Sequence, residues 1–272
     1  MYADLHIHST YSDGLFTPSE IVTMCKELRI EMIAITDHDT VSCIQETKDA
    51  ACNILDIIPA VEMSSNIGEI DIHILGYYID CEDGGLLEYF EDFKQHRCAR
   101  AKRIVDKLFH DGIELNFDHI KSVHQNSSLG RPHIAEALVE HGYVNSINEA
   151  FVKYLGYQAP YYEPKKDIHP KEAIRKIRTW KGIPVIAHPG VINDDTLIHQ
   201  LISDGIYGIE VWHPDHNQRC QDKFYAIAKR DGLLMTGGSD FHGFQGTYSQ
   251  IGKYGCGEIE VLRLKECWDC ER

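Results

Sequence analysis

The stretch MYADLHIHSTYSDG, residues 1–14, carries two histidines two residues apart in the first apolar run of the chain. In a β-strand successive side chains point to opposite faces, so His6 and His8 share one face while Leu5 and Ile7 share the other. Two imidazoles side by side suit a metal ion better than a hydrophobic core, and Asp13 follows five residues later. The stretch therefore predicts a first strand that delivers metal ligands.

Strand-like and helix-like segments alternate along most of the chain. Apolar, β-branched segments such as 31–39 and 183–190 are separated by amphipathic segments such as 17–30 and 169–182. This alternation is typical of a parallel sheet with both faces covered by helices. Seven such strands favour an α/β fold of the (β/α)7 barrel type, in which functional groups collect at the C-terminal strand ends.

The alternation stops in the middle of the chain. The segments 86–112, 117–126, 131–144 and 146–156 are polar and helical in pattern. We therefore expect a first part of the barrel at 1–84, an inserted helical cap subdomain at 85–164, and a second part of the barrel at 165–272.

Bulk composition excludes several classes of protein. The chain has 272 residues, a net charge of -15 and nine cysteines without framework spacing. An acidic surface argues against binding to duplex nucleic acid, and an odd set of scattered cysteines favours free thiols in the cytoplasm. No targeting segment is expected, and no apolar stretch approaches the roughly 18 residues that span a membrane. Cys267 and Cys270 lack a second pair, so no zinc site is expected there.

Polar residues follow nearly every predicted strand. They are His6, His8 and Asp13; Asp37, His38 and Asp39; Glu62; His73; His188; His213; and Asp240 and His242. A lone histidine at a strand end needs no function, but repetition at almost every end predicts a polynuclear metal site. Imidazole and carboxylate together suit Zn, Mn or Fe.

The pattern H-x-H…T-D-H…E…H…H-P-G…S-D-F-H, with GRPHIA at 130–135 and GGSDFHG at 237–243, resembles the PHP (polymerase and histidinol phosphatase) family over nearly the whole chain. Amidohydrolase barrels also begin with a histidine pair, but they add a bridging lysine that this chain lacks. The resemblance implies a distorted barrel and a metal-dependent phosphoesterase. It looks closest to the stand-alone branch that hydrolyses nucleoside phosphates, including 3′,5′-bisphosphonucleotides and RNA 5′ ends.

The resemblance also implies a ligand set for two or three divalent ions of Mn, Fe or Zn. One ion would be held by His6, His8, Glu62 and Asp240, a second by Asp13, His38 and His242, and a third by Glu62, His73 and His133. Asp13 stands where some relatives have histidine, which favours harder ions such as Mn²⁺. His133 lies in the expected insertion, and a histidine on a helix surface is the alternative.

Further residues are expected to handle the substrate. His188, in the family's AHPG motif, would contact phosphate or bound water and supply the leaving-group proton, with a metal-bound water as the alternative donor. Arg131 would contact phosphate. Arg97, Arg100 and Arg103 form a helical stripe that could bind a second phosphate or be a solvated face. His213 and His216 are expected at the rim, where His213 would face the substrate. Asp37 and Asp39 would either orient ligand imidazoles or act as caps.

The function expected from the resemblance is hydrolysis by metal-activated hydroxide of a small phosphorylated substrate, with no membrane partner. That substrate would be a nucleotide such as AMP, a 3′,5′-bisphosphonucleotide, or the 5′ end of a short oligonucleotide. One alternative is a phosphatase for a non-nucleotide monoester such as histidinol phosphate. The other is a catalytically silent metal-binding module.

Overall fold

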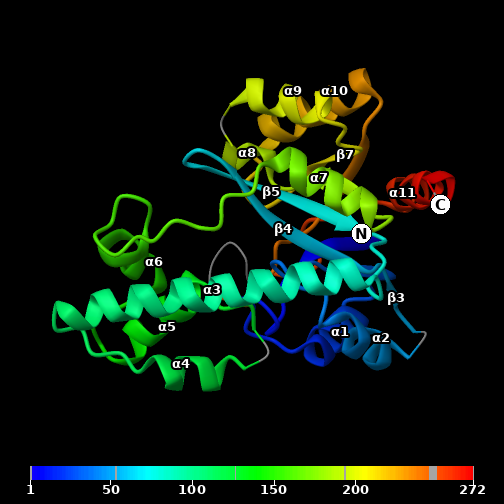
Figure 1. Ribbon diagram of the computed structural model, residues 1–272. Coiled ribbons are helices and arrows are strands. Elements are labelled where there is room, and N and C mark those ends of the chain that lie inside the picture. The colour runs from blue at the N-terminus through cyan, green and yellow to red at the C-terminus, as the bar shows by residue number, and fades with distance from the viewer. Residues whose placement is uncertain (1, 53, 126, 193, 245–249, 272) are drawn as a thin grey trace. The chain divides into compact units, whose positions relative to one another are not determined.

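The computed structural model describes residues 2–271 apart from 53, 126, 193 and 245–249 (Figure 1). The chain divides into two compact units. The first comprises Met1–Leu87 and Ile168–Arg272, and the second comprises Glu88–Asp167. No helix among the described residues is both long and apolar enough to cross a bilayer.

The first unit contains two sheets that form a mixed α/β structure. The smaller sheet is parallel and has the order β1 (Ala3–Ile7), β2 (Met32–Ile35), β3 (Asp56–Ile57). The larger has the order β4 (Ala60–Ile67), β5 (Ile70–Tyr77), β6 (Ile183–Ile186), β7 (Gly208–Trp212), β8 (Leu234–Gly237). Isolated parallel bridges between Ile7 and Phe241 and between His38 and Glu62 connect the two sheets.

The expectation of a purely parallel sheet is wrong for β5, which runs antiparallel to both β4 and β6. Ile67 pairs with Ile70, so only two residues join β4 to β5, and Gly68 there has a φ of 57°. A parallel connection needs a dozen or more residues, whereas a two-residue turn with a glycine at positive φ closes a hairpin. The short connection thus dictates the reversal.

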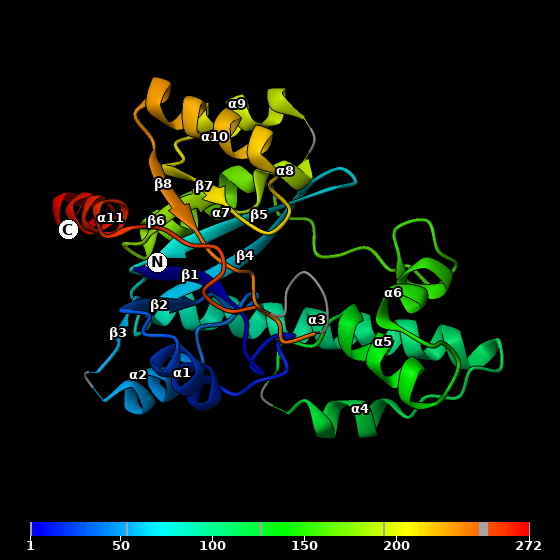
Figure 2. The ribbon, with the colours of Figure 1, turned by 180° about the vertical axis from the view of Figure 1, so that it is seen from behind.

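Helices pack against these sheets (Figure 2), in which β6, β7 and β8 run parallel to one another. α7 (Pro170–Thr179) packs against β4, β5 and β6, and α10 (Gln218–Asp231) packs against β7. The remaining helices of this unit are α1 (Pro18–Glu27), α2 (Ile44–Ala51), α8 (Pro189–Ile192), α9 (Asp195–Ser203) and α11 (Glu258–Glu271). The amphipathic segment predicted at 17–30 contains α1, and Thr17 and Glu20 form a capping box at the start of this helix.

α11 was not predicted. Its buried residues are Val261 and Leu264, so the apolar stripe is narrow and the sequence pattern is weak. The core of this unit includes Leu5 of β1, Leu75 of β5 and Val185 of β6, together with Leu264. α11 thus contributes to the same core as the strands.

The described part of the second unit is helical. Its elements are most of α3 (Gly84–His110), then α4 (Phe117–Val123), α5 (Arg131–Glu140), α6 (Ile147–Ala150) and the π-helix η1 (Phe151–Leu155). The unit has its own hydrophobic core, in which Ile104 and Leu108 of α3 cluster with Ile134 and Leu138 of α5 and with Leu155.

Candidate metal centre

Histidines and carboxylates from seven strands or strand ends gather in the first unit. His6 lies in β1 and His8 follows it; His38 follows β2; Glu62 lies in β4 and His73 in β5; His188 follows β6; Glu210 lies in β7 and His213 follows it; Asp240 and His242 follow β8. Asp13 comes from the loop after β1. Each residue is buried or half-buried.

Glu62 occupies the centre of this cluster and is 1% exposed. Its two carboxylate oxygens lie 2.8–3.3 Å from ring nitrogens of five histidines, namely His6, His8, His38, His73 and His188. Burial alone would raise the pKa of Glu62, but the surrounding imidazoles lower that pKa well below its usual value. Glu62 is therefore a permanent carboxylate that can face more than one ion.

Four ligand atoms converge at one side of Glu62. His6 Nε2 and His8 Nε2 lie 3.3 Å and 3.1 Å from Glu62 Oε2, and 3.3 Å and 3.2 Å from Asp240 Oδ1. Four ligands placed tetrahedrally about 2.0–2.1 Å from an ion would be roughly 3.3 Å apart. These separations fit a divalent transition metal.

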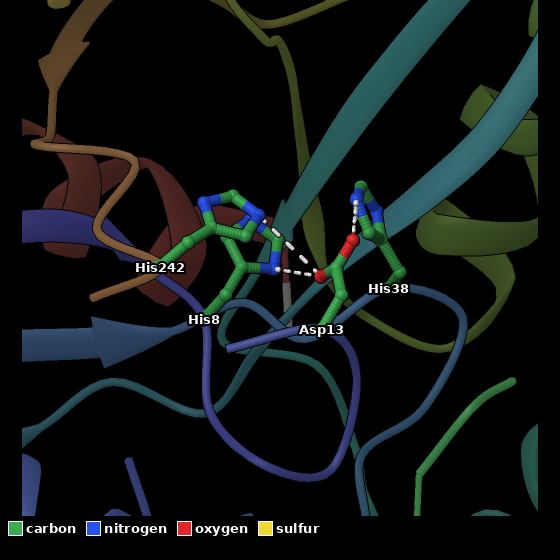
Figure 3. Close-up of side chains that lie close together, drawn as sticks. All are labelled: His8, Asp13, His38 and His242. Atoms are coloured by element: carbon green, nitrogen blue, oxygen red, sulfur yellow. Dashed lines mark ion pairs between the residues drawn. The ribbon is translucent and has the colours of Figure 1, made fainter. Parts of the chain in front are cut away.

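Asp13 forms the centre of a neighbouring group with His8, His38 and His242 (Figure 3). Its carboxylate oxygens lie 3.4 Å from His242 Nε2, 3.8 Å from His38 Nε2 and 3.8 Å from His8 Nδ1. His38, Glu62 and His73 form another group, and His6, His213 and Asp240 a further one. The structure thus brings together every expected ligand of the first unit.

Hydrogen bonds on the outer side of the rings define which nitrogen faces the cluster. Ser12 Oγ donates its single proton to Asp37 Oδ1 (2.6 Å). The same oxygen must therefore accept a hydrogen bond from His8 Nδ1 (3.3 Å). His242 Nδ1 lies 2.7 Å from the Asp240 carbonyl oxygen and must donate to it. His8 and His242 therefore direct Nε2 at the cluster, which is the arrangement typical of metal-bound histidines.

The inward nitrogens show that the site requires positive charge. His6 Nε2, His8 Nε2 and His38 Nδ1 are buried without a hydrogen-bond partner in the described part of the chain. In a neutral ring such a nitrogen would turn a lone pair toward carboxylate oxygens, which is repulsive without a cation between them. Burial opposes a charged ring, yet Asp240 and Glu62 raise the pKa of His8 to about 10. The residues present therefore fit bound divalent metal ions.

Asp37 and Asp39 have different supporting contacts. Asp37 accepts hydrogen bonds from Ser9 N–H (2.7 Å) and from the hydroxyls of Ser9 and Ser12, so it orients His8 through Ser12. Asp39 accepts from Ser64 N–H (2.8 Å) and ties the loop after β2 to β4. Neither residue caps a helix.

Sequence reasoning missed Glu210. Its Oε1 lies 3.0 Å from His6 Nδ1, and its Oε2 accepts a hydrogen bond from His188 N–H (2.7 Å). The available signal was a glutamate between Ile209 and Val211, since a charged residue inside a buried apolar strand is rare unless it is paired.

The expected rim position of His213 and His216 is wrong, because both rings are buried. His213 Nε2 lies 3.3 Å from Asp240 Oδ2. His216 Nε2 accepts from Gly190 N–H (3.0 Å), and its Nδ1 lies 2.9 Å from the Val211 carbonyl oxygen. The segment after β7 is therefore buried, and the two hydrogen bonds of His216 hold it in place.

Arginines predicted to bind substrate belong to the second unit and have contacts within it. Arg100 is 7% exposed, and its Nε donates to the Glu163 carbonyl oxygen (2.9 Å). Arg103 Nε donates to the carboxylate of the same glutamate (3.0 Å). Part of the expected stripe is therefore used for packing, while Arg97 on the same helix is half-buried.

Arg131 and His133 lie at the start of α5. Arg131 donates to the Leu155 carbonyl oxygen (3.2 Å) and lies over the rings of Phe151 and Tyr162. Gly130 N–H donates to His133 Nδ1 (2.9 Å), which in a neutral ring places the proton on Nε2. Metal binding through His133 Nε2 would require that this hydrogen bond be released, so its ligand role stays a prediction.

The chain is similar to several known proteins. The PHP domain model matches residues 4–183. A 3′,5′-nucleoside bisphosphate phosphatase of Chromobacterium violaceum is 34% identical and covers 88% of this chain and 86% of its own length. The 5′-3′ exoribonuclease Rnm of Escherichia coli is 31% identical and covers 88% and 84%. A solved structure from Bifidobacterium adolescentis, assigned as a metal-dependent phosphoesterase, is 28% identical with a TM-score of 0.89 and covers 98% and 96%.

Proposed function

The chain belongs to the PHP domain family and is a metal-dependent phosphoesterase, and from this premise we propose that its substrate is a nucleotide. The proposed reaction removes phosphate from AMP or a 3′,5′-bisphosphonucleotide, or cleaves at the 5′ end of a short oligonucleotide. The similarity to a bisphosphate phosphatase and to an exoribonuclease supports this substrate class.

The observation that carries the metal-dependent part of the proposed reaction is the proximity of four ligand atoms from His6, His8, Glu62 and Asp240, with buried ring nitrogens turned toward carboxylate oxygens. We assign these four residues to one ion. Asp13, His38 and His242 are assigned to a second ion, since the Nδ1 atom of His8 is engaged by Ser12. Glu62, His73 and His133 are assigned to a third. Two or three ions of Mn, Fe or Zn are compatible with these ligands.

When bound, such ions stabilise charge on the phosphoryl oxygens and lower the pKa of the attacking water. The chain's own residues hold and orient the reactants. His188 Nε2 lies 3.0 Å from Glu62 Oε1 in a half-buried position. Burial opposes its protonation, but the Glu62 carboxylate raises the pKa of His188 above its usual value. Because this ring nitrogen lies beside the carboxylate at the centre of the cluster, we assign His188 as the general acid that donates a proton to the leaving alkoxide.

We also propose that the strands of the first unit close into a distorted (β/α)7 barrel. The bridge from Ile7 to Phe241 would join β1 to the segment after β8, and the bridge from His38 to Glu62 would join the segment after β2 to β4. The ring would then contain β1, β2, β4, β5, β6, β7 and β8. Residues of the helical unit would form an inserted subdomain, as expected for 85–164.

Arg97 and Arg131 remain proposed phosphate contacts, because a substrate with two phosphates needs fixed cations besides the metal ions. Arg100 is used instead within the helical unit, where its Nε donates to the Glu163 carbonyl oxygen. The proposed location is the cytoplasm. All nine cysteines lie in the described part of the chain and are free, which suits a reducing compartment.

Phosphate release after metal removal and Mn²⁺ addition tests the proposal. The substrates are AMP, adenosine 3′,5′-bisphosphate, a 5′-phosphorylated dinucleotide and histidinol phosphate. We expect Mn²⁺-dependent turnover of the bisphosphate or the dinucleotide. Turnover of histidinol phosphate alone would overturn the nucleotide assignment while preserving the metal site, and silence on all four would favour a binding module.

A further inference from the structure

One short segment supplies two buried polar side chains that touch the proposed metal ligands from behind. Glu210 lies within β7 and His213 directly after it, and both are 0% exposed. Glu210 contacts His6, near the start of the chain, and His213 contacts Asp240, near its end.

Glu210 contacts His6 through one carboxylate oxygen and His188 through the other. Glu210 Oε2 accepts from His188 N–H, and a glutamate side chain is ordinarily ionised, so both of its oxygens act as acceptors. His6 Nδ1, at 3.0 Å, must therefore donate, which leaves Nε2 for the cluster. The other oxygen accepts from His188 N–H and holds that residue at a φ of 28°, a conformation that L-residues rarely adopt.

The ring of His213 has the opposite arrangement. Asp215 N–H lies 3.1 Å from His213 Nδ1, and because a backbone N–H can only donate, Nδ1 must accept. In a neutral ring the proton then lies on Nε2, 3.3 Å from Asp240 Oδ2. This N–H donates to one oxygen of Asp240 while the other oxygen faces His6 and His8.

We propose that Glu210 in β7 and His213 directly after it are a pair of positioning residues. Glu210 directs the His6 lone pair at the ion, and His213 aims the Asp240 carboxylate without ligating metal itself. In this role His213 does not contact the substrate. His6, His213 and Asp240 lie close enough together to hold an ion, but His213 would not be one of its ligands. This inference rests on the proposed metal site, but its first test does not require metal.

The first test is nitrogen NMR of the metal-free protein with ¹⁵N-labelled histidine at pH 8. The His213 signals are assigned as those missing from His213→Gln. We expect an N–H signal for Nε2 and an unprotonated, hydrogen-bonded Nδ1. The reverse tautomer, or a lone pair on Nε2, would overturn the positioning role.

The second test compares the Mn²⁺ content and affinity of His213→Gln, His213→Leu and Glu210→Gln. Glutamine can place an N–H near the Nε2 position, whereas leucine fills similar space without a donor. We expect the full number of ions in both His213 variants, near wild-type affinity for His213→Gln, and affinity or activity reduced about 10–100-fold for His213→Leu and Glu210→Gln. In His213→Leu and Glu210→Gln the value of kcat should change more than KM, because neither substitution removes a substrate contact.

Thr47→Val is the matched control, since it removes a buried hydrogen bond to the Cys43 carbonyl oxygen (2.7 Å) at the start of α2. It should keep wild-type Mn²⁺ affinity. Loss of one ion from both His213 variants would show that His213 is a ligand and would overturn the proposal. If the wild-type protein binds no Mn²⁺, the proposed function fails, while the NMR result still decides the tautomer.

Discussion

At the residue scale, the role of each site histidine depends on which ring nitrogen carries the proton. His8 and His242 donate through Nδ1 to Ser12 and to the Asp240 carbonyl, and so they offer Nε2 to the cluster. His213 accepts at Nδ1 and offers a proton instead. Neighbouring histidines therefore act either as metal ligands or as hydrogen-bond donors at Nε2, and the partner of Nδ1 decides which.

Replacing a proposed ligand should remove metal and activity but spare the fold. For His8→Ala and Asp240→Asn we expect kcat/KM to fall at least about 10²-fold, because several kcal/mol of transition-state stabilisation is lost. The measurements are phosphate release, metal content and circular dichroism. His199→Ala, at an exposed position on α9, is the control and should behave as wild type. Near-normal turnover in either ligand variant would contradict the assignment.

Arg131 is the sharpest test of the proposed phosphate contacts. Arg131→Ala should lower kcat/KM by about 10–100-fold through loss of a charge-assisted hydrogen bond of about 1.5–3 kcal/mol, with metal content unchanged. Arg131→Lys keeps the charge but loses the stacking on Phe151 and Tyr162. If both variants are less stable yet have unchanged kinetics, Arg131 only packs the second unit.

At the element scale, the β4–β5 hairpin supplies Glu62 and His73 together. Ser64 pairs with His73 in the ladder, and Glu62 lies two residues before Ser64 on the same face of β4. This pairing brings His73 Nδ1 to 2.8 Å from Glu62 Oε1. A register slip of one residue would turn one of the two side chains to the other face and separate them.

Replacing Gly68 in the turn of this hairpin by a residue with a side chain should lower the stability of the protein. Gly68 has a φ of 57°, and the space that a Cβ would occupy there is open, so Gly68→Ala adds backbone strain without a clash. We expect a loss of about 1–2 kcal/mol in unfolding free energy and a Tm lower by about 2–4 °C per kcal/mol. Gly84→Ala, also in open space but without positive φ, is the control. Equal Tm values for the two variants would contradict the strain argument.

At the scale of the whole molecule, the concentration of like charge around Glu62, Asp13 and Asp240 ties stability to bound cations. Mn²⁺ at about 100 times its Kd should stabilise the native state by about 2.7 kcal/mol per site. Chelation should reverse this gain, as measured by differential scanning calorimetry. His8→Ala should show a much smaller shift, and an equal shift would indicate binding elsewhere.

Because the two units have separate cores, this stabilisation should be unequal between them. We expect Mn²⁺ to slow hydrogen exchange in β1 and β4, which carry His6 and Glu62, more than at Leu108 or Leu138 in the second core. Uniform slowing across both units would show that they unfold together.

The sequence by itself determined the residue types and their spacing. His6 and His8 share a strand face because strand side chains alternate, and the polar strand ends at His38, Glu62 and Asp240 marked a metal site. The alternation of segments predicted an α/β fold for the first unit and helices for the second. The family resemblance, carried by short motifs, is confirmed by the match to the PHP domain model.

Only the tertiary structure decided the direction of β5, the burial of His213 and the function of Glu210. A two-residue connection reversed β5, although its apolar pattern is that of any buried strand. Glu210 meets His6 across 204 positions of sequence, and His213 meets Asp240 across 27. Donor and acceptor roles arise from such meetings, because a proton's position on an imidazole depends on the atoms around it and not on its neighbours in the chain.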